Sequence, residues 1–202
     1  MLIINADPTR MIDLPDVGPC QRPVDIDQAV TGFQRLKSLR IYRFGAGATI
    51  AGDSEGDEVY IVPIGGAVEL QITGVTPLKA TLSAGSGNRA LYMAPNHSYR
   101  LTPESETLVA YARAAAAGRV LSHVVPKPGD TLAEALSLMT ANLSDGETMA
   151  NDNTKERLIH VVTGAIIVAG QSVFASQTAA LARDQTGLVQ AVGPTTLLMV
   201  SA

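Results

Sequence analysis

Residues 38–69 read SLRIYRFGAGATIAGDSEGDEVYIVPIGGAVE. Apolar side chains alternate over residues 39–44, and residues 59–64 are rich in β-branched and aromatic types, so both segments are predicted to be strands. An acidic loop at residues 53–57 separates the two strands. The stretch therefore predicts a compact β-unit with turns that depend on glycine.

Gly65 and Gly66 predict a two-residue hairpin turn of the primed type, because glycine adopts positive φ values at the lowest cost. This turn would pair residues 67–72 back onto residues 59–64. Short strands with glycine turns at close spacing are typical of a β-sandwich or a β-barrel. Further strands are expected at residues 78–82, 90–94, 107–113 and 196–200.

The stretch recurs at residues 137–168 as SLMTANLSDGETMANDNTKERLIHVVTGAIIV, aligned without a gap. Two tandem copies of one β-unit predict two similar domains rather than one large sandwich. The identical pairs are Ser38/Ser137, Leu39/Leu138, Gly47/Gly146, Thr49/Thr148, Ala51/Ala150, Asp53/Asp152, Val62/Val161 and Gly65/Gly164.

The repeat divides the chain into four predicted parts. Residues 1–36 form an N-terminal arm that packs on the first barrel or on a partner subunit, and its end, residues 26–36, fits either a short helix or a strand. The first barrel spans residues 37–114 and the second spans 132–202. The small, flexible and proline-containing residues 115–131 are predicted to be a linker.

Composition excludes several classes of protein. The chain is 46% hydrophobic and 17% charged, with a net charge of −4 and a pI near 5.3, which disfavours a nucleic-acid surface. The single Cys20 forms no internal disulfide. The sequence shows neither a signal peptide at its start nor an apolar run of ~20 residues. A cytoplasmic protein is therefore expected.

Two segments resemble the motifs of the cupin superfamily. Glu58 and Gly65 have the spacing of the glutamate and the glycine in the first cupin motif, and residues 95–100 (PNHSYR) are similar to the second motif. The resemblance implies an all-β fold of two tandem jelly-roll (cupin) barrels, a bicupin. It also implies that a ligand binds in a barrel mouth.

The sequence departs from the cupin pattern at the metal ligands. The first-motif histidine positions fall on Gly52 and Ser54, or on Ala51 and Asp53 with the longer spacing. The second-motif histidine position falls on Arg100, and arginine is no metal ligand. The resemblance therefore implies a cupin without a catalytic metal.

Five residues are candidates for ligand binding in the first barrel, and each has a structural alternative. Arg100 and Glu58 fit an ion pair that clamps a carboxylate or phosphate, or a salt bridge at the rim. Asp53 fits an acid/base group or a turn cap. His97 fits a general base or ligand, or a loop histidine on the surface. Tyr60 fits a pocket wall or core packing.

The second copy offers fewer candidates. Asp152 recurs at the position of Asp53, whereas Arg157 stands where the first copy has Glu58. His123 and His160 are interpreted as structural residues. The charged positions of the repeat are therefore not shared between the two copies.

Three functions remain open. The first is a metal-free cupin that binds a small carboxylate or sugar acid in the first barrel, with or without catalysis by proton transfer. The second is a non-catalytic cupin that acts as a sensor or as a dimerisation module. The third is a metal-dependent isomerase or dioxygenase with unusual ligands. The expected partners are a small molecule and a second subunit in a homodimer, but neither nucleic acid nor a membrane.

Overall fold

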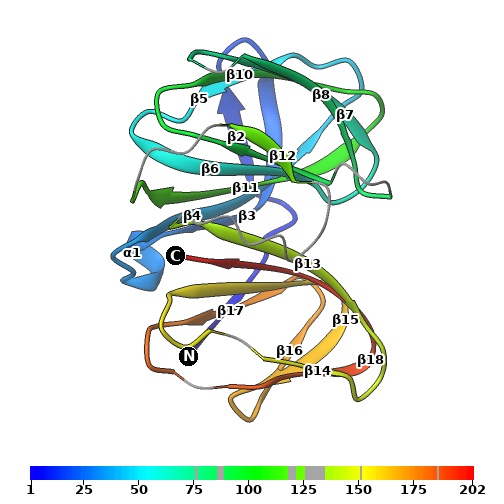
Figure 1. Cartoon of the computed structure of the whole chain (residues 1–202). Helices are drawn as coiled ribbons and strands as arrows, with labels where there is room; N and C mark the ends of the chain where they lie inside the picture. Colours follow the sequence, from blue (N-terminus) through cyan, green and yellow to red (C-terminus); the bar gives the residue numbers. More distant parts are fainter. Residues whose placement is uncertain (76, 86–88, 118–121, 126–134, 151, 186) are drawn as a thin grey trace.

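In the computed structural model of the chain, residues 1–75, 77–85, 89–117, 122–125, 135–150, 152–185 and 187–202 are described, and β-strands dominate (Figure 1). The described part holds no helix of the length and apolarity that a bilayer crossing requires. The elements are β1 (Leu2–Asn5), β2 (Met11–Leu14), β3 (Gly18–Asp27), α1 (Gln28–Thr31), β4 (Leu36–Phe44), β5 (Ile50–Asp53), β6 (Asp57–Pro63), β7 (Ala67–Thr73), β8 (Leu78–Ser83), β9 (Ala90–Met93), β10 (Ser98–Pro103), β11 (Thr107–Ala115), β12 (His123–Val125), β13 (Ser137–Leu143), β14 (Thr148–Met149), β15 (Arg157–Val168), β16 (Gln171–Phe174), β17 (Gln177–Leu181) and β18 (Val189–Ser201).

The strands form three sheets. The central sheet has the order β12-β9-β6-β11-β4-β3-β2, and the outer sheet has the order β5-β10-β7-β8. The C-terminal sheet has the order β1-β17-β15-β18-β13, with β14 on β18 and β16 on β15. In Figure 1 the central and outer sheets form the upper half of the molecule, and the C-terminal sheet forms the lower half.

The central sheet is buried on both faces. On β11, Val109 and Tyr111 belong to the apolar cluster shared with the outer sheet. Their neighbours Ala110 and Ala112 belong to the cluster shared with the C-terminal sheet. A strand that is buried on both faces needs apolar residues at successive positions, and all seven residues of β6 are buried accordingly.

The C-terminal sheet curls around a third apolar cluster, which includes Val161, Ile166 and Leu197. The pairing of β15 with β18 shifts register on both sides of Thr163, and such irregularities bend a strand. Gly164 lies in this bend with φ of 82°, and a Cβ there would lie 2.4 Å from Oγ1 of Thr195. Only glycine fits at this position.

The predicted hairpin at Gly65-Gly66 is wrong. β6 pairs with β9 and β11 in the central sheet, whereas β7 pairs with β8 and β10 in the outer sheet. The chain therefore crosses between two sheets at this point. Only Gly66 has a positive φ, of 73°, so the turn also lacks the two positive φ values of the primed type. The segments 59–64 and 67–72 are strands as predicted.

The N-terminal residues contribute strands to two sheets. β1 pairs with β17 of the C-terminal sheet, and β3 pairs with β4 of the central sheet. The segment 26–36 contains the end of β3, the short helix α1 and the start of β4. Asp27 caps α1, because its carboxylate accepts hydrogen bonds from the backbone amides of Ala29 (3.0 Å) and Val30 (3.2 Å).

The same strand order occurs twice. The central sheet contains β9-β6-β11-β4, and the C-terminal sheet contains β17-β15-β18-β13. Two of the four strand pairs lie in the sequence repeat, since β4 aligns with β13 and β6 with the first part of β15. The domain boundaries that the repeat predicts stay predictions.

Candidate functional site

A pocket of about 560 Å³ opens at the β5 edge of the outer sheet, and we call it the rim pocket. Arg100 on β10 and Asp53 at the end of β5 both line it, so two of the five candidates share one pocket. Asp16, in the turn that follows β2, faces them from the central sheet. The lining residues are Leu14, Pro15, Asp16, Val17, Ile50, Ala51, Gly52, Asp53, Gln71, Thr73, Ser98, Tyr99 and Arg100.

Arg100 lies on the solvent-facing side of the outer sheet. It is exposed, whereas its neighbour Leu101 is fully buried in the cluster between the outer and central sheets. Successive residues of a strand point to opposite faces. Arg100 can therefore contact a ligand at the rim, and not deep between the sheets.

A smaller cavity of about 100 Å³, the inner pocket, lies between the central and outer sheets. It shares Asp53 and Tyr99 with the rim pocket, which places the two pockets side by side. The residues that line it are Leu14, Ser38, Arg40, Tyr42, Phe44, Ile50, Ala51, Asp53, Val59, Tyr99, Tyr111 and Arg113.

Aromatic rings form one wall of the inner pocket. The ring of Tyr42 stacks on Phe44 with centroids 5.5 Å apart and meets Tyr111 edge-on at 5.4 Å. The ring of Tyr99 lies 5.8 Å from that of Tyr111. Burial raises the pKa of Tyr99 to about 12 and also raises the pKa of Tyr111. Both hydroxyls are therefore neutral donors at physiological pH.

Tyr99 occupies the space beside a position where the cupin motif has a histidine. Gly52 pairs with Tyr99 across the β5–β10 ladder, and a Cβ on Gly52 would lie 2.7 Å from Cε1 of the tyrosine ring. That distance is shorter than real Cβ contacts. The glycine is therefore required for the tyrosine to lie across it, and no larger side chain fits without displacing the ring.

Two buried donors of the inner pocket lack a hydrogen-bonded acceptor among the described residues. They are the hydroxyl of Tyr111 and Nε of Arg113. The hydroxyls of Tyr99 and Tyr111 interact electrostatically, but no contact of the Tyr111 hydroxyl has hydrogen-bond geometry. Buried donors without acceptors are uncommon and indicate a place for water or a ligand oxygen.

Ion pairs hold the arginines of the inner pocket. Nη2 of Arg113 donates to the carbonyl of Ser54 at 2.8 Å and lies 3.3 Å from the carboxylate of Asp57. Nε of Arg40 donates to Asp25 at 3.1 Å. Asp25 also binds Arg10 and Arg22, so this carboxylate faces three guanidinium groups and the cluster keeps a surplus of positive charge.

Glu58 and Tyr60 lie on the opposite face of the central sheet from both pockets. Tyr60 belongs to the cluster shared with the C-terminal sheet. Glu58 is fully buried, and its carboxylate accepts hydrogen bonds from the backbone amides of Leu136 (2.9 Å) and Ala117 (3.2 Å). The structure does not bring Glu58 to the exposed Arg100, so the expected ion pair between them is not formed.

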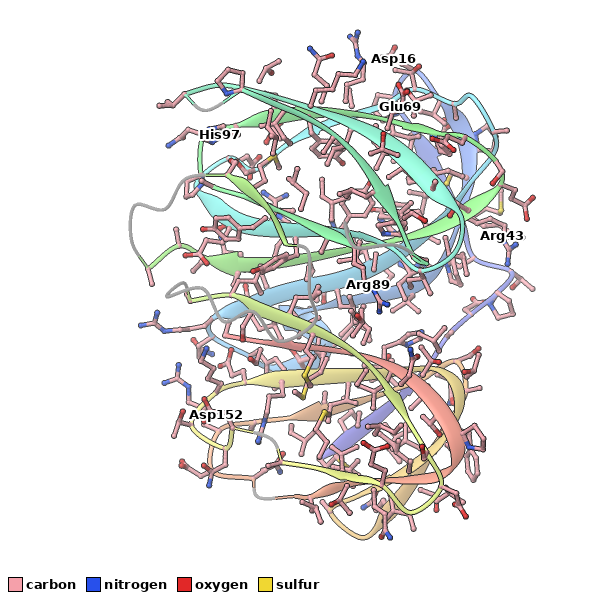
Figure 2. All side chains as sticks on the ribbon, turned by 45° about the vertical axis from the view of Figure 1, so that its right-hand side comes forward. Asp16, Arg43, Glu69, Arg89, His97 and Asp152 are labelled. Carbon is pink, nitrogen blue, oxygen red and sulfur yellow. The ribbon has the colours of Figure 1, made fainter. Side chains whose placement is uncertain are left out.

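His97, labelled in Figure 2, lies in the loop before β10. It is buried and is not an exposed histidine of a surface loop. Its Nδ1 lies 2.9 Å from the carbonyl of Pro95 and 3.1 Å from that of Ala94. Its backbone amide donates to Oγ of Ser54 at 3.0 Å. His97 lines neither the rim pocket nor the inner pocket, and its contacts fix the loop between β9 and β10.

In the second copy, the candidate residues have structural partners. Asp152 caps a turn, because its carboxylate accepts hydrogen bonds from the amide (2.9 Å) and the hydroxyl (2.6 Å) of Thr154. Nδ1 of His160 lies 2.9 Å from Oγ1 of Thr178, and burial lowers the pKa of His160 to about 4. His123 lies on β12, and its side chain is outside the described residues.

The three candidate donor groups of the first half, Asp53, Glu58 and His97, do not converge on one point. Asp53 lines the rim, Glu58 faces the other side of the central sheet, and His97 is held by backbone carbonyls. Within the described ranges, no group of three or more His, Cys, Asp or Glu residues could hold one. Transition metals bind imidazole, thiolate and carboxylate groups that converge on one point.

Sequence reasoning missed most of the inner pocket. Arg40 and Tyr42 alternate on β4, and Tyr111 and Arg113 alternate on β11, so each pair points to one face. A polar residue at every second position of an apolar strand is the signal that could have identified them. Arg40 and Tyr111 are directly opposite each other in the β4–β11 pairing.

No protein-family model matches the sequence. No curated protein matches it either. Among solved structures, bacterial pirin YhhW from Escherichia coli in complex with nickel(II) superimposes with a TM-score of 0.71 at 14% identity, over 99% of this chain and 98% of that one. Quercetin 2,3-dioxygenase from Acinetobacter baumannii gives a TM-score of 0.72 at 11% identity, over 100% of this chain and 85% of that one.

A cupin 2 conserved barrel domain protein from Leptotrichia buccalis gives a TM-score of 0.56 at 15% identity, over 98% of this chain and 91% of that one. The chain has the cupin fold. An oxalate decarboxylase from Lactobacillus farciminis also superimposes, with a TM-score of 0.72 at 8% identity over 100% of this chain and 86% of that one, so two named reactions occur on this fold and the fold alone does not fix a reaction.

Proposed function

We propose that this cupin-like protein binds a small hydroxylated carboxylate, such as a sugar acid, across the rim and inner pockets without a catalytic metal. The observation that carries the proposal is the pair of buried donors, the Tyr111 hydroxyl and Nε of Arg113, that line the inner pocket without acceptors. A ligand carboxylate would satisfy both donors, and hydrogen bonds to a charged group contribute roughly 1.5–3 kcal/mol each.

The charges around the two pockets support this ligand class. Arg40 and Arg113 line the inner pocket and favour a carboxylate there. Asp16 and Asp53 line the rim pocket, where their carboxylates would accept hydrogen bonds from the hydroxyl groups of the ligand, and Arg100 offers a further cation. The rim pocket, at about 560 Å³, has the size of a typical small-molecule site.

We also propose that the chain is a bicupin with two tandem jelly-roll barrels. The repeated strand order supports this arrangement, because β9-β6-β11-β4 and β17-β15-β18-β13 contain the strands that the sequence repeat aligns. The curled C-terminal sheet around its own apolar cluster is a second support. A homodimer and a cytoplasmic location stay predictions.

Ligand binding is tested by titration calorimetry of purified protein with glucuronate, gluconate and lactate. Tyr111→Phe and Arg113→Lys should each weaken binding of the preferred acid by about tenfold, the loss of one charge-assisted hydrogen bond. Arg100→Ala should weaken binding less, because Arg100 is exposed at the rim. Arg43→Ala is the matched control, since Arg43 pairs with Glu106 on the surface, away from both pockets (Figure 2).

Equal binding by wild type and Tyr111→Phe would contradict the proposal, as would the absence of binding to any of the three acids. Metal analysis of the same preparation distinguishes the proposed metal-free protein from the metal-dependent alternative. A stoichiometric content of iron, nickel, manganese or zinc that is lost in Asp53→Ala would replace the metal-free proposal.

A further inference from the structure

Another pocket, of about 320 Å³, opens at the C-terminal sheet, and we call it the C-terminal pocket. Asp152, one of its lining residues, lies at the left of the lower half in Figure 2. The lining residues are Ser137, Leu138, Met139, Met149, Ala150, Asp152, Lys155, Arg157, Met199 and Ser201.

The C-terminal pocket corresponds to the inner pocket in strand register but differs in chemistry. On β4 and β11, Arg40 lies opposite Tyr111 and both line the inner pocket. On β13 and β18, Met139 lies opposite Met199 and both line the C-terminal pocket. An arginine–tyrosine pair is thus replaced by two methionines.

Thioether and alkyl groups form the walls of this pocket. Met139, Met149 and Met199 are half-buried and line the cavity, and Met149 and Met199 also pack against the apolar cluster of the C-terminal sheet. Methionine is flexible and polarizable, and methionine-lined surfaces adapt to apolar ligands of different shape. The hydroxyls of Ser137 and Ser201 lie 2.7 Å apart and share one hydrogen bond at the edge of this wall.

The charges at the pocket favour an anion. Lys155 and Arg157 contribute two positive charges, and Asp152 contributes one negative charge that already accepts hydrogen bonds from Thr154. Arg157 is fully buried, and Nη2 donates to the carbonyls of Gln185 (2.6 Å) and Ala182 (3.2 Å). Among the described residues, Lys155 forms no ion pair, so its ammonium group is available at the mouth. This surplus of positive charge also disfavours a soft metal cation between the thioethers.

We infer that the C-terminal pocket binds an apolar carboxylate, with the apolar body against Met139, Met149 and Met199 and the carboxylate on Lys155. The volume of about 320 Å³ lies within the range of small-molecule sites and excludes a large ligand. The inference does not rest on ligand binding in the first half, because the C-terminal pocket shares no lining residue with the rim pocket or the inner pocket.

Calorimetric titration of the full chain with octanoate tests the inference. Octanol carries the same chain without the charge, and acetate carries the charge without the chain, so both should bind at least about tenfold more weakly than octanoate. Lys155→Ala should weaken octanoate binding by about tenfold, the loss of a charge-assisted hydrogen bond. Ala150→Trp, at an exposed lining position, should obstruct the pocket and abolish binding.

Two control variants locate the site. Lys79→Ala removes a lysine of β8 on the outer sheet, and Arg43→Ala removes an arginine of β4 that pairs with Glu106 on the surface. Both should leave octanoate binding unchanged. Octanoate affinity that is unaffected by Ala150→Trp and by Lys155→Ala would overturn the inference, as would equal affinities for octanoate and octanol. Thermal unfolding of each variant verifies that it is folded, and Met199→Gln provides a second, uncharged change in the wall that should weaken octanoate binding.

Discussion

The carboxylate of Glu156 accepts a hydrogen bond of 2.8 Å from the backbone amide of Leu36. The same carboxylate accepts hydrogen bonds from the amides of Gln34 (2.7 Å) and Arg35 (2.8 Å), so it holds the chain where β4 of the central sheet begins. Glu58 makes the reciprocal contact, since its carboxylate accepts from the amide of Leu136, immediately before β13. Each glutamate lies at the start of a strand in one sheet and fixes the entry of a strand in the other.

Glu156→Ala should destabilise the protein by roughly 3 kcal/mol or more, because it leaves three backbone amides of a part-buried segment without their acceptor. The free energy of unfolding is measured by urea titration at pH 7. Glu106→Ala is the matched control: this exposed glutamate makes a surface ion pair with Arg43, which is worth less than about 1 kcal/mol. Equal losses in the two variants would show that Glu156 does not stabilise the contact between the sheets.

His160 should make the protein less stable in mild acid. Burial lowers its pKa from 6.5 to about 4, so between these values the unfolded chain binds a proton that the folded chain does not. The free energy of unfolding therefore falls as the pH drops from about 6.5 to about 4, by about 3 kcal/mol from this group. His160→Gln keeps a polar partner for Thr178 and replaces the titratable imidazole by an amide that binds no proton in this pH range.

Urea titrations of wild type and His160→Gln at pH 7 and pH 4.5 provide the comparison. Carboxylates titrate equally in both proteins, so the difference between the two curves isolates the histidine. Parallel losses of stability in wild type and variant would show that His160 takes up its proton in the folded state.

Gly52→Ala should displace the ring of Tyr99, because the new Cβ would lie 2.7 Å from it. A displaced and hydrated Tyr99 would titrate closer to pH 10 than to its native pKa of about 12. Absorbance at 295 nm during an alkaline titration follows the phenolates. Gly56→Ala is the control, since no atom lies within 4 Å of a Cβ at that position. An unchanged titration curve in Gly52→Ala would mean that the Tyr99 ring keeps its buried position beside the new Cβ.

Peroxide should oxidise the methionines in the order of their exposure. Met11, which is 53% exposed, should react first, and Met93, which is fully buried, should react last. Met139, Met149 and Met199 should react at intermediate rates, because they face an open pocket. Peptide mapping by mass spectrometry gives each rate. Protection of these three to the level of Met93 would show that the C-terminal pocket is closed in solution.

Local sequence patterns predicted individual strands well. The segments at residues 39–44, 59–64 and 107–113 have alternating or β-branched patterns, and the structure places β4, β6 and β11 there. The all-β class follows from these patterns and from the glycine turns. The hairpin at Gly65-Gly66 failed because a glycine pair marks a change of direction and does not say whether the next strand stays in the same sheet.

The candidate site was predicted in part. Arg100 and Asp53 do line one pocket, whereas Glu58 and Tyr60 face the opposite side of the central sheet. The face of a strand changes with a shift of one residue, and in a strand buried on both faces the apolar pattern cannot indicate which face meets the pocket. The place of Arg113 in the inner pocket could not be predicted without the pairing of β11 with its neighbours. This pairing brings Arg113 beside Ser38 on β4 and Val59 on β6.

The pairing of β1 with β17 has a consequence for biosynthesis. Leu2–Asn5 is synthesised well before its hydrogen-bonding partner Gln177–Leu181, since Asn5 and Gln177 lie 172 residues apart in the chain. At a synthesis rate of roughly 5–20 residues per second, the unpaired first strand waits on the order of ten seconds or longer. The C-terminal sheet therefore closes only after β17 has been synthesised, and a chain truncated before β17 would leave β1 without its native partner.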